Sequence, residues 1–214
     1  MHQAGRGALL ETFRCGGGRA DVWRDGADAD ALAAVVAGLV QPWRSERISK
    51  VVGIDSPRFL LGGAAAISLG AGFVAVREAS LLPGPEMTAE TAADYPGLRH
   101  LLRMQSVLGV RDRVLLVDDW AEGGSQACAA RELVESCGAT FAGVAVLVDQ
   151  LDPGPRAALG RVTSLMRADE LRTPDPARDS ESQQQPVGEQ PLTAIRARGR
   201  SAPGMLPVNA HIAM

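Results

Sequence analysis

Strand-like and helix-like segments alternate along the first four fifths of the chain, and this alternation limits the folds that it can adopt. Four runs are strand-like: 48–54, 72–77, 113–117 and 140–148. The last two are continuous and apolar, as is typical of strands buried on both faces. Three segments carry Ala, Leu and Val at helical spacing: 28–40, 59–69 and 126–137. Such alternation produces parallel β-α-β units, so the sequence predicts an α/β protein whose open, mainly parallel sheet is flanked by helices.

Two stretches interrupt this pattern. Residues 78–97 form a long connection with prolines at 83, 85 and 96, followed by a strand-like stretch at 98–104. A connection of this length in a compact domain is usually a lid or lacks regular structure. From Thr173 onward the chain has no aromatic residue and is rich in Pro, Ser and Gln, so it cannot bury enough apolar surface to offset the entropy lost on ordering. We therefore expect an N-terminal segment (1–44), a main domain (45–172) and a disordered tail (173–214).

Charge and cysteine content exclude several classes of protein. The formal net charge is -3 and Lys50 is the only lysine, which argues against a large basic face for nucleic acid or anionic lipid. No apolar run is long enough to span a membrane, and the N-terminus lacks a signal-peptide pattern. The cysteines at 15, 128 and 137 form no CxxC pair, so neither a zinc site nor a disulfide framework is indicated. These features predict a cytoplasmic protein that binds neither membranes nor nucleic acid.

The passage Val114–Gln126 contains the clearest functional pattern. An apolar strand runs into Asp118 and Asp119, and the small residues Gly123-Gly124-Ser125 then lead into a helix. Backbone N–H groups of such a loop and helix start can hold a phosphate, and two adjacent carboxylates can accept hydrogen bonds from the hydroxyls of a ribose. A metal-dependent hydrolase that uses the acid pair is a minor alternative, because no histidine or third acid lies nearby in the sequence.

This passage resembles the 5-phosphoribosyl-1-pyrophosphate (PRPP) loop of type I phosphoribosyltransferases, in which an apolar strand, two acids and three variable residues precede Thr-Gly-x-Thr. Gly124 takes the glycine position, while Gly123 and Gln126 stand where the family usually has threonines. The resemblance implies that PRPP is bound by Asp118, Asp119, Ala121, Glu122, Gly123, Gly124, Ser125 and Gln126.

Two further passages resemble the adenine phosphoribosyltransferase-like branch of that family. Residues 51–62 resemble its pyrophosphate-binding loop, with Pro57 and Arg58 in place of an Arg-Gly pair. Pro57 has no N–H to offer, whereas the Arg58 guanidinium can bind a phosphate through two donors. The resemblance implies a pyrophosphate site made of Asp55, Ser56, Arg58 and Arg77.

Residues 72–104 resemble the flexible catalytic loop of the same enzymes and the strands that flank it. Tyr95 stands where an aromatic residue of the lid would close over the substrate, and Glu78 stands where the family generally has lysine. His100 is expected to be solvated. The aromatic residues of the N-terminal segment, which forms a hood over the base in these relatives, are expected more often in the core than on the base: Phe13, Trp23 and Trp43. Trp120 is expected either to flank the base or to pack beneath its loop.

The resemblance implies a purine phosphoribosyltransferase that moves ribose 5-phosphate from PRPP to adenine or a related purine, with Mg²⁺ bound near Asp118 and Asp119 and a homodimer as the assembly. Glu122 occupies a position where relatives that act on 6-oxopurines have an acid facing N7 of the base. It is therefore our first candidate for a general acid/base, with Asp94 as the competing candidate and Tyr95 beside it. Two alternatives stay open: a non-catalytic protein that senses PRPP or nucleotides, and an enzyme that modifies a base in a specialised biosynthetic pathway.

Overall fold

The structure is a computed structural model of the whole chain, and it describes residues 2–12, 15–16, 19–20, 27–78, 82–93 and 97–171, with the backbone alone at 11–12, 15–16, 19–20 and 56–57. Contacts divide the chain into two compact units, Met1–Pro174 and Asp175–Met214. The description below concerns the first unit. The predictions made for Asp94, Tyr95, Phe13, Trp23 and the tail lie outside the described residues.

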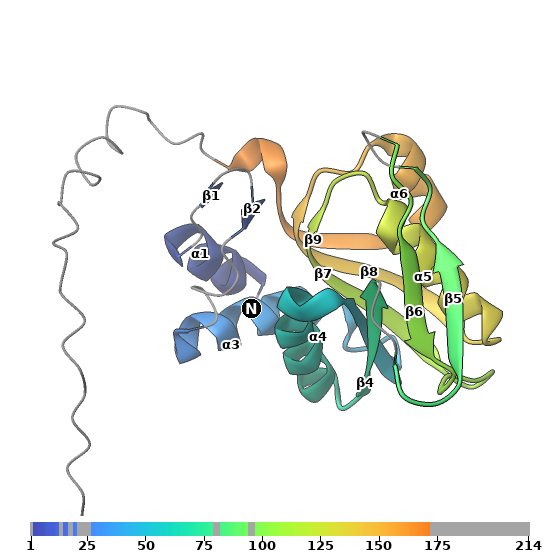
Figure 1. Ribbon diagram of the computed structural model, residues 1–214. Helices are drawn as coiled ribbons and strands as arrows, with labels where there is room; N and C mark the ends of the chain where they lie inside the picture. The colour runs from blue at the N-terminus through green and yellow to red at the C-terminus, as the bar shows by residue number, and fades with distance from the viewer. Residues whose placement is uncertain are drawn as a thin grey trace, which may run out of the picture. The chain divides into compact units, whose positions relative to one another are not determined.

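A seven-stranded sheet forms the centre of this unit (Figure 1). Its strands, in chain order, are β3 (Lys50–Ile54), β4 (Gly72–Glu78), β5 (Glu86–Glu90), β6 (Leu101–Gln105), β7 (Arg113–Ala121), β8 (Thr140–Asp149) and β9 (Val162–Arg167). Their order in the sheet is β5-β6-β4-β3-β7-β8-β9. The five strands from β4 to β9 in that order are parallel, and the antiparallel strands β6 and β5 extend the sheet beyond β4. The predicted open, mainly parallel sheet is confirmed.

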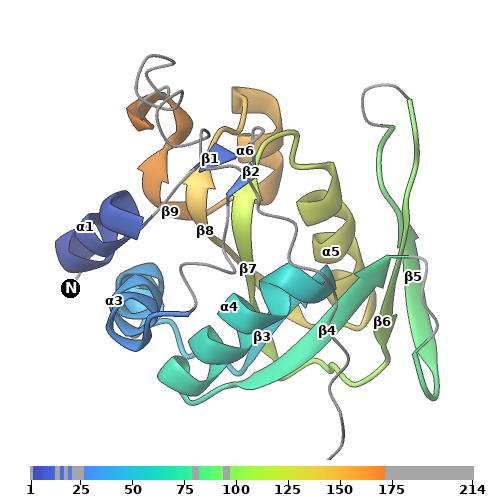
Figure 2. The ribbon, with the colours of Figure 1, turned by 60° about the vertical axis from the view of Figure 1, so that its left-hand side comes forward.

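Helices cover both faces of the sheet (Figure 2). They are α1 (His2–Thr12), α3 (Ala29–Val40), α4 (Asp55–Leu69), α5 (Ser125–Ser136) and α6 (Pro153–Leu159), with short 3₁₀ turns at Gln41–Trp43 and Ala168–Glu170 and a small hairpin of β1 (Cys15–Gly16) and β2 (Arg19–Ala20). Asp28 caps α3, because its carboxylate accepts a hydrogen bond from Ala31 N at 2.8 Å.

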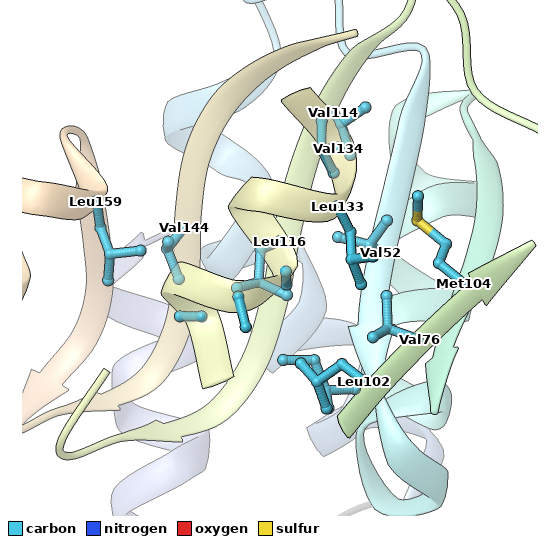
Figure 3. Close-up of a cluster of buried hydrophobic side chains, with 14 of the residues drawn as sticks. Val52, Val76, Leu102, Met104, Val114, Leu116, Leu133, Val134, Val144 and Leu159 are labelled. Atoms are coloured by element: carbon cyan, nitrogen blue, oxygen red, sulfur yellow. The ribbon is translucent and has the colours of Figure 1, made fainter. Parts of the chain in front are cut away.

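Alternation of side chains along the buried strands divides the core into two clusters. Val52, Leu116 and Val144 point to the face covered by α5 and α6, where they meet Leu133 and Leu159 (Figure 3). The residues between them on the same strands point to the opposite face, which α1, α3 and α4 cover, and include Val51, Leu115 and Ala145. The near-continuous apolar runs read from the sequence follow from this double burial.

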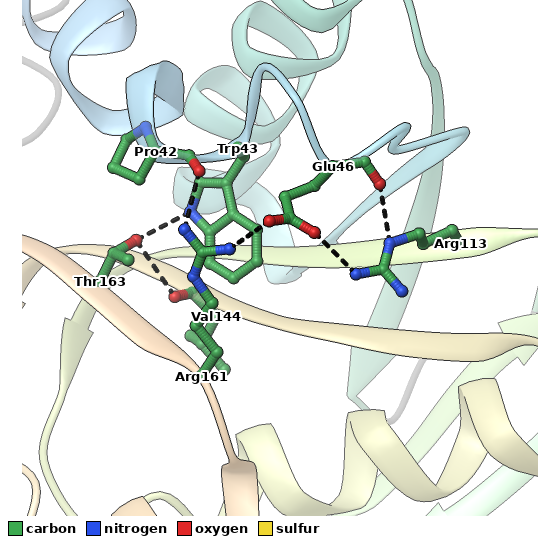
Figure 4. Close-up of polar contacts among 7 residues, drawn as sticks. All are labelled: Pro42, Trp43, Glu46, Arg113, Val144, Arg161 and Thr163. Carbon is green, nitrogen blue, oxygen red and sulfur yellow. Dashed lines mark hydrogen bonds and ion pairs between the residues drawn. The ribbon is translucent and has the colours of Figure 1, made fainter.

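Trp43 anchors the second cluster, as the sequence favoured, and is fully buried. Its indole N–H donates to Thr163 Oγ1 at 2.8 Å, and the Arg161 guanidinium lies 4.4 Å above its ring (Figure 4). Arg161 and Arg113 both pair with the Glu46 carboxylate. These contacts join the segment after α3 to the amino-terminal ends of β7 and β9, on the edge of the sheet opposite the candidate site.

The connections reverse direction between β3 and β7. From β3 the chain passes through α4 to β4 on one side, and it later places β7 on the other side of β3. The carboxyl ends of β3 and β7 therefore meet where neighbouring connections leave in opposite directions, which is where open α/β sheets bind ligands.

Three predicted boundaries were wrong. Helix α4 starts at Asp55, four residues before the predicted start, and β7 continues through both acids to Ala121. The long connection contains β5, which pairs with β6 along Glu86–Glu90. Within the described residues, no helix is long and apolar enough to span a membrane.

Candidate functional site

Asp118 and Asp119 are the last acidic residues of β7 and lie at the carboxyl edge of the sheet. Their side chains are 9% and 15% exposed. Asp118 Oδ1 accepts a hydrogen bond from Asp119 N at 2.7 Å, and Asp119 Oδ1 accepts one from Trp120 N at 2.9 Å. The strand backbone thus fixes the orientation of both carboxylates.

Arg58, in the first turn of α4, bridges the two acids. Its Nε lies 2.5 Å from Asp118 Oδ1 and donates a hydrogen bond to Asp119 Oδ1 at 3.0 Å. Its Nη1 donates to the carbonyl of Ile54, the last residue of β3, at 3.3 Å. The sequence assigned Arg58 to pyrophosphate, whereas the structure pairs it with the acids that were assigned to the ribose.

The two carboxyls differ in their affinity for a proton. Burial raises the pKa of Asp118 well above its usual range, although the charge of Arg58 opposes this. Burial also acts to raise the pKa of Asp119, but hydrogen bonding from Asp118 and the charge of Arg58 lower it overall. The pair therefore titrates as a unit in which Asp118 retains a proton more readily than Asp119.

The segment that follows β7 forms a loop around the start of α5. Ala121 is buried, Glu122 and Gly123 are exposed, and Gly124 is the N-cap of α5 with φ 73° and ψ -1°. The first turn of the helix, which contains Ser125 and Gln126, presents backbone N–H groups without intrahelical acceptors. The sequence predicted that this loop and helix start can hold a phosphate, and we call residues 121–126 the cradle. In the structure the cradle lies next to the acid pair at the end of the same strand.

The start of α4 faces the end of β4. Asp55 has φ 59°, a left-handed conformation that costs a non-glycine residue about 1 kcal/mol or more. Its Oδ1 accepts a hydrogen bond from Glu78 N at 3.1 Å, which ties the start of α4 to β4. Ser56 lies in the same helical turn. Arg77 alternates with the buried Val76 along β4, so it points to the face of the sheet that α4 covers.

Glu78 connects β4 to His100, the residue before β6, and to α5. Its carboxylate contacts His100 Nδ1, and it accepts a hydrogen bond from Gln126 Nε2 at 3.4 Å. The expectation that His100 is merely solvated was wrong. The signal that could have found it is strand alternation, because His100 shares the parity of Leu102 and Met104, which point to the α5 face.

Trp120 packs against the cluster under α3 and α4, and its indole N–H donates to Gln150 Oε1 at 2.8 Å. Gln150 follows β8 and was not identified from the sequence. Whether Trp120 flanks the base or packs beneath its loop stays a prediction.

The protein offers few ligands for a metal ion of its own. Among the residues that the structure describes, no group of three or more His, Cys, Asp or Glu side chains could hold one. The acid pair supplies carboxylate oxygens, which suit Mg²⁺, but phosphate oxygens or water would have to complete its coordination.

Comparison with known proteins gives a consistent result. No family model matches the chain. An adenine phosphoribosyltransferase from a Nocardioides species is 42% identical over 140 residues, which cover 64% of this chain and 75% of that protein.

Solved structures agree. The adenine phosphoribosyltransferase from Rhodothermus marinus superposes with a TM-score of 0.68 at 29% identity, over 77% of this chain and 99% of that one. The enzyme from Giardia lamblia, solved with 9-deazaadenine, superposes with a TM-score of 0.64 at 33% identity, over 70% of this chain and 86% of that one.

Proposed function

The chain belongs to the adenine phosphoribosyltransferase family, and from this premise we propose that it transfers ribose 5-phosphate from PRPP to adenine or a related purine and releases pyrophosphate, as in nucleotide salvage. One observation carries the proposal: the acid pair at the end of β7 continues directly into the cradle at the start of α5, at the reversal point of the sheet.

The ribose 5-phosphate group fits the β7–α5 segment. Asp118 and Asp119 would accept hydrogen bonds from the 2′- and 3′-hydroxyls of the ribose. The backbone of residues 121–126 would bind the 5′-phosphate, because the helix start concentrates N–H donors and positive potential there. This binding needs neither lysine nor the threonines that the family usually has.

Pyrophosphate would lie between the start of α4 and the end of β4. The residues assigned to it are Asp55, Ser56, Arg58 and Arg77, of which the two arginines supply positive charge. The hydrogen bond from Glu78 N to Asp55 supports this assignment, because it holds the two walls of the site together. In the structure the Arg58 Nε pairs with the two acids, so it would have to leave them to bind pyrophosphate.

In the reaction, the bond from C1′ to the pyrophosphate oxygen breaks and a bond from C1′ to a purine nitrogen forms. Pyrophosphate leaves with the electron pair, and the purine loses one ring proton. We propose that Glu122 accepts that proton from N7 of the purine. Glu122 is exposed at the edge of the cradle. Asp94 is the competing candidate, with Tyr95 as the residue that excludes water.

Mg²⁺ would enter with PRPP, because no third carboxylate joins the acid pair among the described residues. Once bound, it would neutralise part of the phosphate charge. We also propose that the enzyme acts in the cytoplasm as a homodimer, which light scattering coupled to size exclusion would test.

The test is a pyrophosphate-release assay with PRPP, Mg²⁺ and, in turn, adenine, hypoxanthine, guanine and xanthine. Turnover with at least one purine is expected, and Glu122→Gln should lower kcat for that purine by roughly 100-fold or more, the usual worth of a general base. Asp94→Asn is the matched comparison. An unchanged rate in Glu122→Gln would remove Glu122 from the mechanism, and no release with any purine would contradict the function.

A further inference from the structure

Arg58 contacts one oxygen, Oδ1, of each of the two carboxylates that the proposed function gives to the ribose. Its side chain is only 24% exposed, and its contacts with Asp118 Oδ1 and Asp119 Oδ1 are 2.5 Å and 3.0 Å long. This arginine lies on α4, whereas the acids lie on β7, so the contact joins the two walls of the reversal point.

Both oxygens also hold a backbone donor. Asp119 N donates to Asp118 Oδ1, and Trp120 N donates to Asp119 Oδ1. A carboxylate oxygen has room for about two donors. The N–H groups belong to the strand and cannot withdraw without distorting it, whereas the Arg58 side chain can rotate away. A ribose hydroxyl that bonds to these oxygens would therefore displace Arg58.

We propose that Arg58 is a specificity-determining residue that competes with ribose hydroxyls for the acid pair and moves to the pyrophosphate when PRPP binds, an inference that rests on the proposed function. In the structure Arg58 is the counter-ion of the two acids. When PRPP binds, the hydroxyls take the carboxylate oxygens and the guanidinium gains new phosphate partners. Its position in the first turn of α4, with Nη1 at the carbonyl of Ile54, keeps it beside that phosphate site.

A ligand without pyrophosphate has no pyrophosphate oxygens that could replace the two carboxylates as partners of Arg58. Ribose 5-phosphate and the nucleoside monophosphate product both carry the hydroxyls and the 5′-phosphate, but they must break the ion pairs without replacing them. Arg58 thus favours the substrate PRPP over the product, and its return to the acids promotes product release. A charge-assisted hydrogen bond lost without replacement corresponds to roughly 10- to 100-fold in affinity.

The experiment is isothermal titration of PRPP, ribose 5-phosphate and AMP, each with Mg²⁺, into the wild-type protein, Arg58→Ala and Arg58→Lys. We expect Arg58→Ala to bind ribose 5-phosphate and AMP about 10-fold or more tightly, and to reduce the preference for PRPP over ribose 5-phosphate by about 10- to 100-fold. Arg58→Lys should lie between, because an ammonium keeps the charge but not the fork of donors. Product inhibition by AMP should strengthen by the same factor as AMP binding.

The control is Arg131→Ala, which removes an arginine–carboxylate pair from the surface of α5. Arg131→Ala should change neither the preference for PRPP over ribose 5-phosphate nor the preference for PRPP over AMP. If Arg58→Ala weakens all three ligands equally, or leaves the preference for PRPP unchanged, the competition is refuted even though the enzyme binds its substrates. If the wild-type protein binds none of the three, the proposed function itself is refuted, and this inference with it. Should Arg58→Ala unfold, Arg58→Lys must still show the reduced preference.

Discussion

Gly124→Ala tests whether the cradle at the start of α5 depends on its backbone geometry. Gly124 has φ 73°, and a Cβ added there would lie 2.9 Å from Pro155 Cβ and 3.0 Å from Leu151 Cδ2. The left-handed conformation alone costs an alanine about 1–2 kcal/mol. Because Pro155 cannot rotate away as a long flexible chain would, the crowding adds to this cost, and we expect a total of about 2–3 kcal/mol.

Thermal unfolding measures this loss. For a unit of this size, 1 kcal/mol corresponds to about 2–4 °C, so Gly124→Ala should melt roughly 4–12 °C below the wild-type protein. If the alanine instead shifts the loop to relieve the contact, the N–H groups move out of register, and the KM for PRPP should rise at least about 10-fold, as loss of one or more charge-assisted hydrogen bonds implies.

Gly123→Ala is the matched control for stability. Gly123 lies in the same loop, has open space around an added Cβ and has no positive φ. The alanine should leave the melting temperature within about 2 °C of the wild-type value, since surface substitutions usually change stability by less than about 0.5 kcal/mol. If Gly124→Ala and Gly123→Ala melt together and also have the same KM for PRPP, the account of the cradle is refuted.

Three other substitutions test the fold and the acid pair. Gly143→Ala should destabilise the protein by about 3 kcal/mol or more in urea unfolding, because its Cβ would lie 2.2 Å from the Arg161 carbonyl oxygen at φ 144°; a loss under about 1 kcal/mol would contradict the packing. Hydrogen bonds and the charges of its arginine partners lower the pKa of Glu46 below its ordinary 4.5, so its contribution to stability is full above pH 4.5 and is lost as the pH falls through the folded pKa. Glu46→Gln should therefore be less stable than the wild-type protein at pH 7, and this loss of stability should shrink in acid. A loss that stays constant with pH would refute this. Burial raises the pKa of the Asp118 carboxyl above its ordinary 3.8, so this group opposes folding increasingly as the pH rises above 3.8. The stability of Asp118→Asn relative to the wild-type protein should therefore improve from pH 4 to pH 8. The opposite trend would exclude a raised pKa.

The buried strands could be predicted because burial on both faces leaves a plain apolar signature. β3, β4, β7 and β8 each overlap the segment that the sequence predicted for them. The end of β7 could not be predicted, because acidic residues usually mark the end of a buried strand. Here Arg58, distant in sequence, supplies the charge that allows Asp118 and Asp119 to remain within it.

Edge elements escaped prediction for a different reason. β5 has the sequence Glu-Met-Thr-Ala-Glu, which carries little β-propensity, and it exists because β6 offers it a partner. Neither α6 nor β9 was identified, because a seven-residue helix and an edge strand leave little periodicity to read.

The residues of the acid pair and the cradle could be predicted from the sequence, but the side chains with which site residues pair could not. Asp118 to Gln126 form the acid pair and cradle that the sequence indicated. The partners that only tertiary structure brings together had no local signal: Arg58 with the acids, His100 with Glu78, and Gln150 with Trp120. These residues lie far apart in sequence and meet only because of the order of the strands in the sheet.

The most direct test of the central claim is detection, by mass spectrometry, of the nucleoside monophosphate formed from PRPP, Mg²⁺ and adenine or another purine. The wild-type protein should form it together with an equal amount of pyrophosphate, and Asp119→Asn should form it at least about 10-fold more slowly, because the ribose then loses a charged acceptor. If the wild-type protein binds PRPP but forms no nucleotide with any purine, the chain is not a phosphoribosyltransferase of these bases. Equal rates in the wild-type protein and Asp119→Asn would show that the acid pair is not the site of the reaction.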